Sequence, residues 1–154
     1  VLSTKESIEE HVINCDLLIG GVLIPGAAAP KLVSEDLVSK MKKGSVLVDV
    51  AIDQGGCIET SKPTTHSDPM YILHDVIHYC VTNMPGCVPR TSTYSLNEAT
   101  ISYIRFLAKN GLNESLKNDS HLRNGLNVMM GKCTQFDVAR DLDLEFTDPL
   151  TLLN

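Results

Sequence analysis

Three short aliphatic runs constrain the fold of this 154-residue chain more than any other feature of its sequence. They occupy residues 16–24, 45–50 and 76–81, with little alternation of polar and apolar side chains. Such runs are too short to cross a bilayer, and they are typical of strands that are buried on both faces of a parallel sheet. We therefore predict three parallel strands.

Helix signals lie before and between the first two runs. Ser3 and Glu6 have the spacing of a capping box, which predicts a helix over residues 4–14. Ser34 is a suitable N-cap for a second helix, which has acidic residues in its first turn, lysines in its last turn and Gly44 as its stop. Strand, helix and strand in this order form the βαβ unit that builds parallel sheets, so the predicted fold class is α/β.

The pattern changes after Pro89. Ser95 opens a second capping box, which predicts a long helix that begins there and ends at Asn110. Weaker helical stretches and a short apolar tail follow, at residues 114–123, 135–141 and 150–153. We predict that the chain divides into a βα-type part, residues 1–89, and a helical part, residues 90–154, that cannot complete a core alone.

Composition narrows the classes of function. The formal net charge of −6, without any run of Lys or Arg, argues against a nucleic-acid partner. No apolar stretch approaches the roughly 20 residues of a membrane span, and no secretory leader is recognisable, so we expect no membrane partner. The five cysteines form no CxxC pair, which predicts free thiols in the reducing cytoplasm.

Two partial motifs suggest other chemistry. His74 and His78 have the spacing of the HExxH zinc signature, but the acid between them is aspartate and the segment is predicted to enter a strand. We therefore expect no metal site. Cys57, Cys80 and Cys87 have no paired histidine at a recognisable spacing, so we interpret them as small buried hydrophobic residues rather than nucleophiles.

Glycine and polar residues follow the ends of all three predicted strands, at residues 20–21, 53–56 and 83–86. Ligands bind beyond the carboxyl ends of parallel strands, and glycine lets the backbone approach a ligand closely, so these tips predict one wall of a cofactor site. Ordinary tight turns remain the alternative. Asp53 is the candidate proton carrier, with a turn-capping aspartate as the alternative interpretation. No G-x-G-x-x-G motif follows a strand, so only the second half of a dinucleotide-binding domain is expected.

Six segments, in a consistent order and spacing, resemble alanine dehydrogenase. They are residues 16–26, 29–33, 48–56, 61–66, 78–86 and 88–93. The resemblance implies an oxidoreductase with NAD as its cofactor. Its reaction is the reversible oxidative deamination of L-alanine to pyruvate and ammonia, a step of L-alanine catabolism.

The resemblance also implies the place of this chain in a larger subunit, which in the family is often assembled as a homohexamer. Residues 1–89 would be the C-terminal half of a Rossmann-like, nucleotide-binding NAD domain. Residues 90–154 would be the connecting helix and the helical C-terminal part of the substrate domain. The glycine-rich phosphate loop and the substrate domain's catalytic His and Lys are not in this sequence, so we expect the chain alone to be inactive.

Carried over position by position, Asp53 matches the family's acid/base carboxylate beside the nicotinamide. Residues implied to contact NAD are Ser3, Val22, Leu23, Val50, Ala51, Ile52, Asp53, Lys62, Val81, Thr82, Asn83 and Met84. Lys62 stands where relatives often have Arg, which keeps the charge but loses the planar fork. Ala28 replaces a lysine that is common in this motif. No metal is implied.

Two other functions stay open. One is the NAD-binding subunit of proton-translocating transhydrogenase, which shares the fold. The segment at residues 51–54 favours alanine dehydrogenase, because the transhydrogenase segment carries Glu in place of Asp53. The other is a noncatalytic half-domain that folds only in an assembly.

Overall fold

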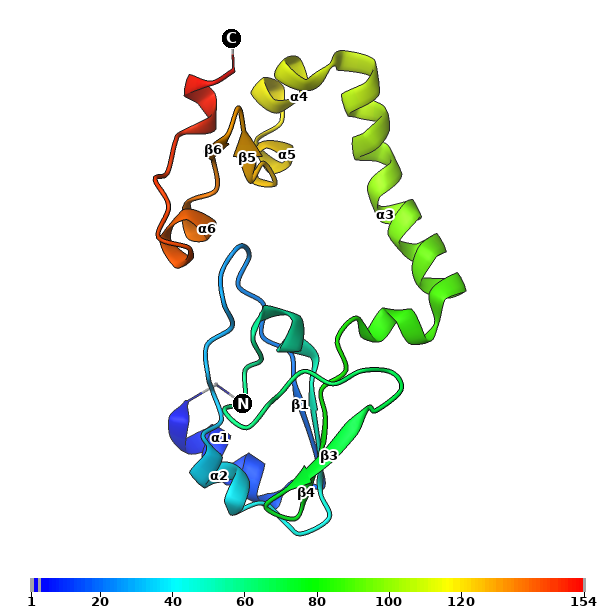
Figure 1. Ribbon diagram of the computed structural model, residues 1–154, viewed down its shortest axis with the longest axis vertical. Coiled ribbons are helices and arrows are strands. Elements are labelled where there is room, and N and C mark those ends of the chain that lie inside the picture. The colour runs from blue at the N-terminus through cyan, green and yellow to red at the C-terminus, as the bar shows by residue number, and fades with distance from the viewer. Residues whose placement is uncertain (1, 3, 154) are drawn as a thin grey trace. The chain divides into compact units, whose positions relative to one another are not determined.

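A four-stranded sheet is the central element of the first of two units into which the chain divides (Figure 1). This unit comprises Val1–Ile24 and Ala28–Cys87, and the other comprises Pro25–Ala27 and Val88–Asn154. The computed structural model describes residue 2 and residues 4–153.

The sheet is mostly parallel, as predicted. β1 (Leu17–Gly20), β2 (Val46–Asp49) and β4 (Val76–Tyr79) pair in parallel, in the order β1-β2-β4. β1 is shorter than the run that predicts it, because the chain leaves the sheet after Gly20. The three strands and their direction are confirmed.

A fourth strand, β3 (Met70–Leu73), pairs antiparallel with β4 at the edge of the sheet and is not predicted from the sequence. His74 and Asp75 form the turn between β3 and β4, with φ of 54° and 60°. Two successive residues at positive φ are typical of a two-residue hairpin turn, which usually carries Asn or Gly. Because the turn carries His and Asp instead, the sequence gives no signal for this hairpin.

Both α-helices of this unit pack against one face of the sheet (Figure 1). α1 (Lys5–Asn14) begins with Thr4, whose hydroxyl accepts the N–H of Ser7 at 3.2 Å. α2 (Glu35–Ser39) begins with Ser34 as predicted. Ser3, the predicted cap of α1, lies outside the described residues. The core between the helices and the sheet includes Val12, Val33, Leu37, Val38, Met41, Leu47, Ile58, Val76 and Cys80.

The opposite face of the sheet is exposed on the outer strands β1 and β3 and partly buried on β2 and β4, so the prediction of strands buried on both faces is wrong for β1. Leu17 and Ile19 of β1 are 53% and 61% exposed, and Met70 and Ile72 of β3 are 58% and 70% exposed. Strand register places Leu17 and Ile72 in one row and Ile19 and Met70 in the next. The apolar runs include the side chains of this second face, which neither α-helix of this unit covers.

The second unit begins with α3 (Pro89–Asn110). The predicted start at Ser95 is wrong, because Ser95 lies within the helix. Proline suits the first turn of a helix, where its missing N–H has no partner to lose. In the part of the chain that the structure describes, no helix is both long and apolar enough to cross a membrane.

Short elements complete the second unit. They are α4 (Leu112–Asn118), α5 (Ser120–Asn124), β5 (Val128–Met129), β6 (Lys132–Cys133), α6 (Phe136–Asp141) and η3 (Pro149–Thr151). The single helix predicted over residues 114–123 is broken at Asp119, whose carboxylate accepts the N–H of Leu122 at 3.0 Å and caps α5. α6 is confirmed, with Gln135 as its N-cap.

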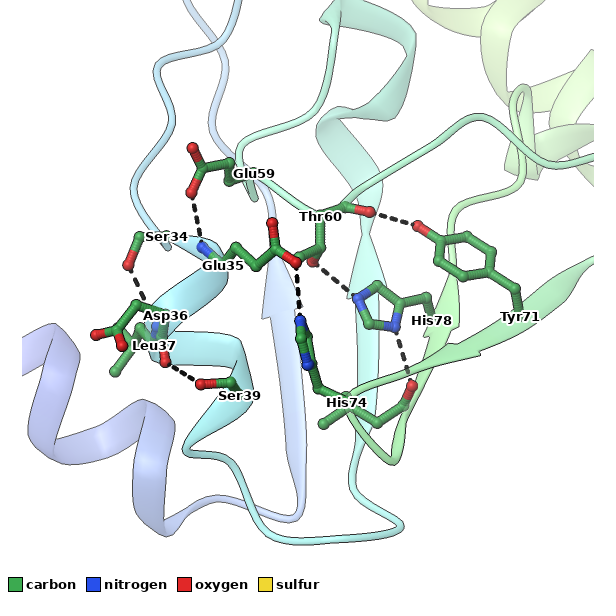
Figure 2. Close-up of polar contacts among 11 residues, drawn as sticks. Ser34, Glu35, Asp36, Leu37, Ser39, Glu59, Thr60, Tyr71, His74 and His78 are labelled. Atoms are coloured by element: carbon green, nitrogen blue, oxygen red, sulfur yellow. Dashed lines mark hydrogen bonds and ion pairs between the residues drawn. The ribbon is translucent and has the colours of Figure 1, made fainter.

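A buried histidine ties β4 to the loop before β3 (Figure 2). The His78 ring lies between Thr60 Oγ1 at 2.8 Å and the Val76 carbonyl at 3.0 Å, and it stacks on Tyr71. Burial is the main cause that lowers the pKa of His78. Burial also raises the pKa of Tyr71 to about 12, and its hydroxyl donates to the Thr60 carbonyl at 2.7 Å. His78 is therefore a neutral structural residue in the fold.

The stability of this fold is expected to fall with pH below about 6.5, the pKa of an unfolded histidine. Because the pKa of folded His78 is lower, the unfolded chain binds more protons between those two values. His78 therefore contributes stability above about pH 6.5 that is lost, at up to about 1.4 kcal/mol per pH unit, as pH falls towards its folded pKa.

Urea unfolding between pH 5 and 8 tests this expectation. His78→Gln should flatten the pH dependence of the unfolding free energy, whereas His121→Gln, at an exposed position of α5, should leave it unchanged. Equal pH dependence in wild type and His78→Gln would contradict the assignment.

Candidate cofactor site

The carboxyl ends of the three parallel strands meet at one edge of the sheet. Gly20, the last residue of β1, lies opposite Asp49, the last residue of β2. β4 ends beside β2, with Tyr79 opposite Val48. The short helix η1 (Val50–Gln54) follows β2 directly, and η2 (Met84–Cys87) follows β4 after a short link.

Asp53 and Asn83 come into contact at this edge. The two carboxylate oxygens of Asp53 lie 3.3 and 3.4 Å from the backbone N of Asn83, which donates to them. Asp53 is exposed, and Asn83 has a φ of 53°, a left-handed conformation that asparagine tolerates better than most residues. Two residues predicted for the site, 30 positions apart, are therefore neighbours, and the carboxylate remains open to solvent.

A buried carboxylate organises the segment that follows η1. Asp49 is fully buried, and its Oδ2 accepts the backbone N–H groups of Cys57 at 2.9 Å and of Ile58 at 3.2 Å. Gly56 has a φ of 76°, and a Cβ there would lie 2.8 Å from Asp49 Oδ2. The close approach of this loop to the carboxylate therefore requires glycine at position 56.

Lys31 also holds this loop. Its Nζ donates to the carbonyls of Gly55 at 2.6 Å and Gly56 at 2.9 Å. Neither Lys31 nor Asp49 is predicted from the sequence as a site residue. A carboxylate at the last position of an aliphatic strand, followed by a Gly-Gly pair, was the available signal for Asp49.

A largely apolar groove of about 430 Å³ lies between α1 and the end of β1. Gly20, Gly21 and Val22 line it, together with Ile8 and Cys57. A Cβ on Gly20 would lie 2.5 Å from Cys57 Sγ, so no side chain fits there. Asp53 does not line this groove. Val22 is thus a predicted contact residue that lines this groove.

The other predicted contact residues differ in what they can offer a ligand. Ala51, Ile52 and Val81 are buried, so their side chains face the core and only their backbone could meet a ligand. Exposed positions are Leu23, Val50 and Lys62, and partly buried ones are Thr82 and Met84. The backbone N–H of Lys62 donates to the Tyr71 hydroxyl at 2.9 Å. Ser3 lies outside the described residues.

The remaining histidine and cysteine candidates differ in their partners and in their burial. His74 Nε2 contacts Glu35 Oε1 at 2.8 Å, whereas the His78 ring contacts Thr60 Oγ1 and the Val76 carbonyl (Figure 2). Among the described residues no group of three or more His, Cys, Asp or Glu side chains could hold a metal ion. Cys57 and Cys80 are buried as predicted, and burial is the main cause that raises the pKa of Cys57, followed by the nearby Asp49 charge.

Cys87 corrects the interpretation of all three cysteines as buried and unpaired. It is exposed, and its Sγ lies 3.0 Å from Nδ1 of His66. The two residues are distant in sequence, and the loop that carries His66 returns to the chain after β4, so no short spacing could reveal the pair.

Comparison with known proteins gives a consistent set of similarities. Residues 1–136 match the family profile described as "Alanine dehydrogenase/PNT, C-terminal domain". The chain is 54% identical over 153 residues to alanine dehydrogenase from Halomonas elongata, covering 99% of the chain and 41% of that protein. It is 52% identical over 151 residues to alanine dehydrogenase from Mycolicibacterium smegmatis, covering 98% and 41%. The chain thus spans about two fifths of these relatives.

Solved structures show the same similarity. An L-alanine dehydrogenase matches with a TM-score of 0.75 and 48% identity, over 92% of this chain and 39% of its own. A transhydrogenase from Sinorhizobium meliloti matches with a TM-score of 0.59 and 26% identity, over 66% of this chain and 30% of its own.

Proposed function

Because the chain belongs to the alanine dehydrogenase/PNT family, we propose that it is part of an NAD-dependent alanine dehydrogenase. The reaction is the reversible oxidative deamination of L-alanine to pyruvate and ammonia. In this proposal residues 1–89 are the C-terminal half of the NAD domain, and residues 90–154 are the connecting helix and the C-terminal part of the substrate domain.

The observation that carries the proposal is the position of Asp53. Its carboxylate is exposed at the edge where three parallel strands end, and the backbone of Asn83 fixes it there. Ligands of open α/β sheets bind beyond this edge. A solvent-accessible carboxylate with one fixed side can exchange a proton with a ligand on the other side.

The residues at this edge fit a dinucleotide. Gly20 and Gly21 leave the tip of β1 without side chains beside an apolar groove, which suits a flat, partly apolar ligand. Val22 and Leu23 would flank the ligand, and the segments at residues 50–53 and 81–84 would bound it, with Lys62 and Ser3 as further contacts. When bound, NAD supplies the acceptor for the hydride that leaves the α-carbon of alanine.

The chain's own task is then to position groups and to move a proton. The Asn83 N–H holds the Asp53 carboxylate, so its oxygens keep one orientation as the substrate amine loses protons. Asp49 and Lys31 fix the loop that leads away from η1. The catalytic His and Lys of the substrate domain belong to other parts of the subunit.

The wider setting follows from the same resemblance. We expect a homo-oligomer, with a hexamer as the specific form, and a cytoplasmic enzyme in which all five cysteines remain thiols. Alanine, pyruvate and ammonia are the expected small-molecule partners, with no nucleic acid or membrane.

Transhydrogenase is the weaker alternative. Its solved relative shares 26% identity over 66% of this chain, compared with 48% over 92% for the alanine dehydrogenase. Hydride transfer between nucleotides would require no amino acid, so dependence on alanine separates the two functions.

A chimera tests the proposal. The chain should replace the matching segment of the Halomonas elongata relative, to which it is 54% identical, and alanine-dependent NADH formation should be measured by absorbance. We expect the chimera to be active with alanine and the 154-residue chain alone to show no activity. A folded, assembled chimera without alanine-dependent activity would refute the proposal. Activity of the chain alone would refute the expectation that it depends on the rest of the subunit.

A further inference from the structure

Cys87 and His66 form a nucleophile–base pair that the proposed dehydrogenase chemistry does not use. Cys87 Sγ lies 3.0 Å from His66 Nδ1, within hydrogen-bond reach for sulfur, and both residues are exposed. A cysteine becomes a useful nucleophile when an adjacent base takes its proton.

The partner on the other side of the imidazole fixes the direction of this hydrogen bond. His66 Nε2 lies 3.1 Å from the Asn83 carbonyl, which can only accept, so Nε2 carries a hydrogen. In the neutral ring Nδ1 is then a free lone pair, and it faces the thiol of Cys87. Thiol, imidazole and orienting carbonyl thus have the arrangement of a cysteine nucleophile with its base and the group that orients the base.

Two further features favour this pair. A Cβ on Gly86 would lie 3.1 Å from His66 Nε2, so glycine at this position gives the imidazole room to contact the Asn83 carbonyl. Tyr79 lies near Cys87, and its pKa is raised, first by burial and then by its interaction with the Cys87 thiol. Cys87 Sγ therefore faces an acceptor for its proton, His66 Nδ1.

The other four thiols differ from Cys87 in access or in partner. Cys57, Cys80 and Cys133 are buried. Cys15 is half-buried, and its thiol donates to the Val12 carbonyl at 3.3 Å, a group that cannot take the proton. Cys15 is therefore the matched control: a reachable thiol without a base.

We propose that Cys87 is a site of reversible thiol–disulfide exchange with low-molecular-weight disulfides, with His66 as its base. The thiol proton passes to His66 Nδ1, and Cys87 Sγ attacks one sulfur of the disulfide. A new S–S bond forms as the old one breaks, and the second half of the reagent leaves as a thiolate. A dithiol reductant reverses the exchange.

The test is a comparison of reaction rates in the folded and the urea-unfolded chain. The full chain is treated with glutathione disulfide or with an aromatic disulfide at pH 7, and each cysteine is followed by mass spectrometry of its peptides. Restricted access in the folded chain slows a thiol, whereas an adjacent base speeds its reaction. Since a free thiol is only a few per cent thiolate at this pH, an adjacent base should make folded Cys87 react about tenfold faster than unfolded Cys87.

His66→Phe removes the base and keeps a ring of similar size. It should return the rate of folded Cys87 to the unfolded value or below, while His121→Phe, on the exposed surface of α5, should leave the rate unchanged. Cys15 should be slower when folded than when unfolded in every variant. The proposal is overturned if folded Cys87 reacts no faster than unfolded Cys87, or if its acceleration survives in His66→Phe.

Discussion

Asp53→Asn is expected to lower kcat for alanine oxidation about 10²- to 10⁴-fold in the active chimera, the range attributed to a general acid–base group. The substitution keeps the size of the side chain, and the amide oxygen can still accept the Asn83 N–H that now holds the carboxylate. It removes the negative charge and the ability to carry a proton. The position of the side chain should therefore be kept, while the proton-transfer step should be slowed.

Separate measurements of binding and turnover make this result interpretable. NAD binding, followed by fluorescence, should change little in Asp53→Asn, and circular dichroism should show an intact fold. Asp36→Asn is the control, because Asp36 is an exposed aspartate of α2 that pairs only with Lys40 among the ion pairs of the described residues. If Asp53→Asn retained kcat within a few-fold of wild type, Asp53 would be a turn residue and the proposed proton role would fail.

Asp49→Ala is expected to destabilise the first unit by about 3–5 kcal/mol. The Asp49 carboxylate is fully buried and accepts two backbone N–H groups, from Cys57 and Ile58. Alanine leaves both donors without a partner in the core, and each buried unsatisfied donor costs about 1–3 kcal/mol. Removal of the side chain also leaves a cavity against the backbone of Gly56.

Chemical unfolding of the full chain measures this loss, and hydrogen exchange gives it a location. The amides of Cys57 and Ile58 should exchange much faster in Asp49→Ala than in wild type, because each loses its acceptor. Asp16→Ala is the matched control, since the Asp16 carboxylate is exposed and pairs with Lys42 on the surface. Surface pairs of this kind contribute about 0–1 kcal/mol. A loss no larger than that of Asp16→Ala would show that the loop does not depend on the buried carboxylate.

The strands and their direction could be predicted because the information is local. Each aliphatic run marks one strand, and the helix signals around Ser34 indicate a parallel connection. The edge strand β3 escaped prediction because its turn uses His74 and Asp75 at positive φ, where the usual Asn-Gly signal is missing. The start of α3 was misplaced because Ser95 has the sequence signal of an N-cap, whereas the helix begins earlier, at Pro89, a residue suited to the first turn.

The candidate site was predictable only in part, for a similar reason. Asp53 and Asn83 follow strand ends, and a parallel sheet brings such positions together whatever lies between them. The contacts of Asp49 with the loop at residues 55–58, and of Cys87 with His66, depend on the path of irregular loops. No periodicity or spacing encodes that path, so these contacts could be found only in the structure.

The connections between the parallel strands set the order in which the first unit can fold. β1 meets β2, and β2 meets β4, only after the chain closes loops of about thirty residues, whose entropy cost precedes any reward from pairing. The β3–β4 hairpin closes through two residues, and α1 needs only its own turn contacts. These local pieces should therefore appear early, on the microsecond timescale of isolated hairpins and helices. Formation of the β1–β2 and β2–β4 pairings should then limit the folding rate of this unit.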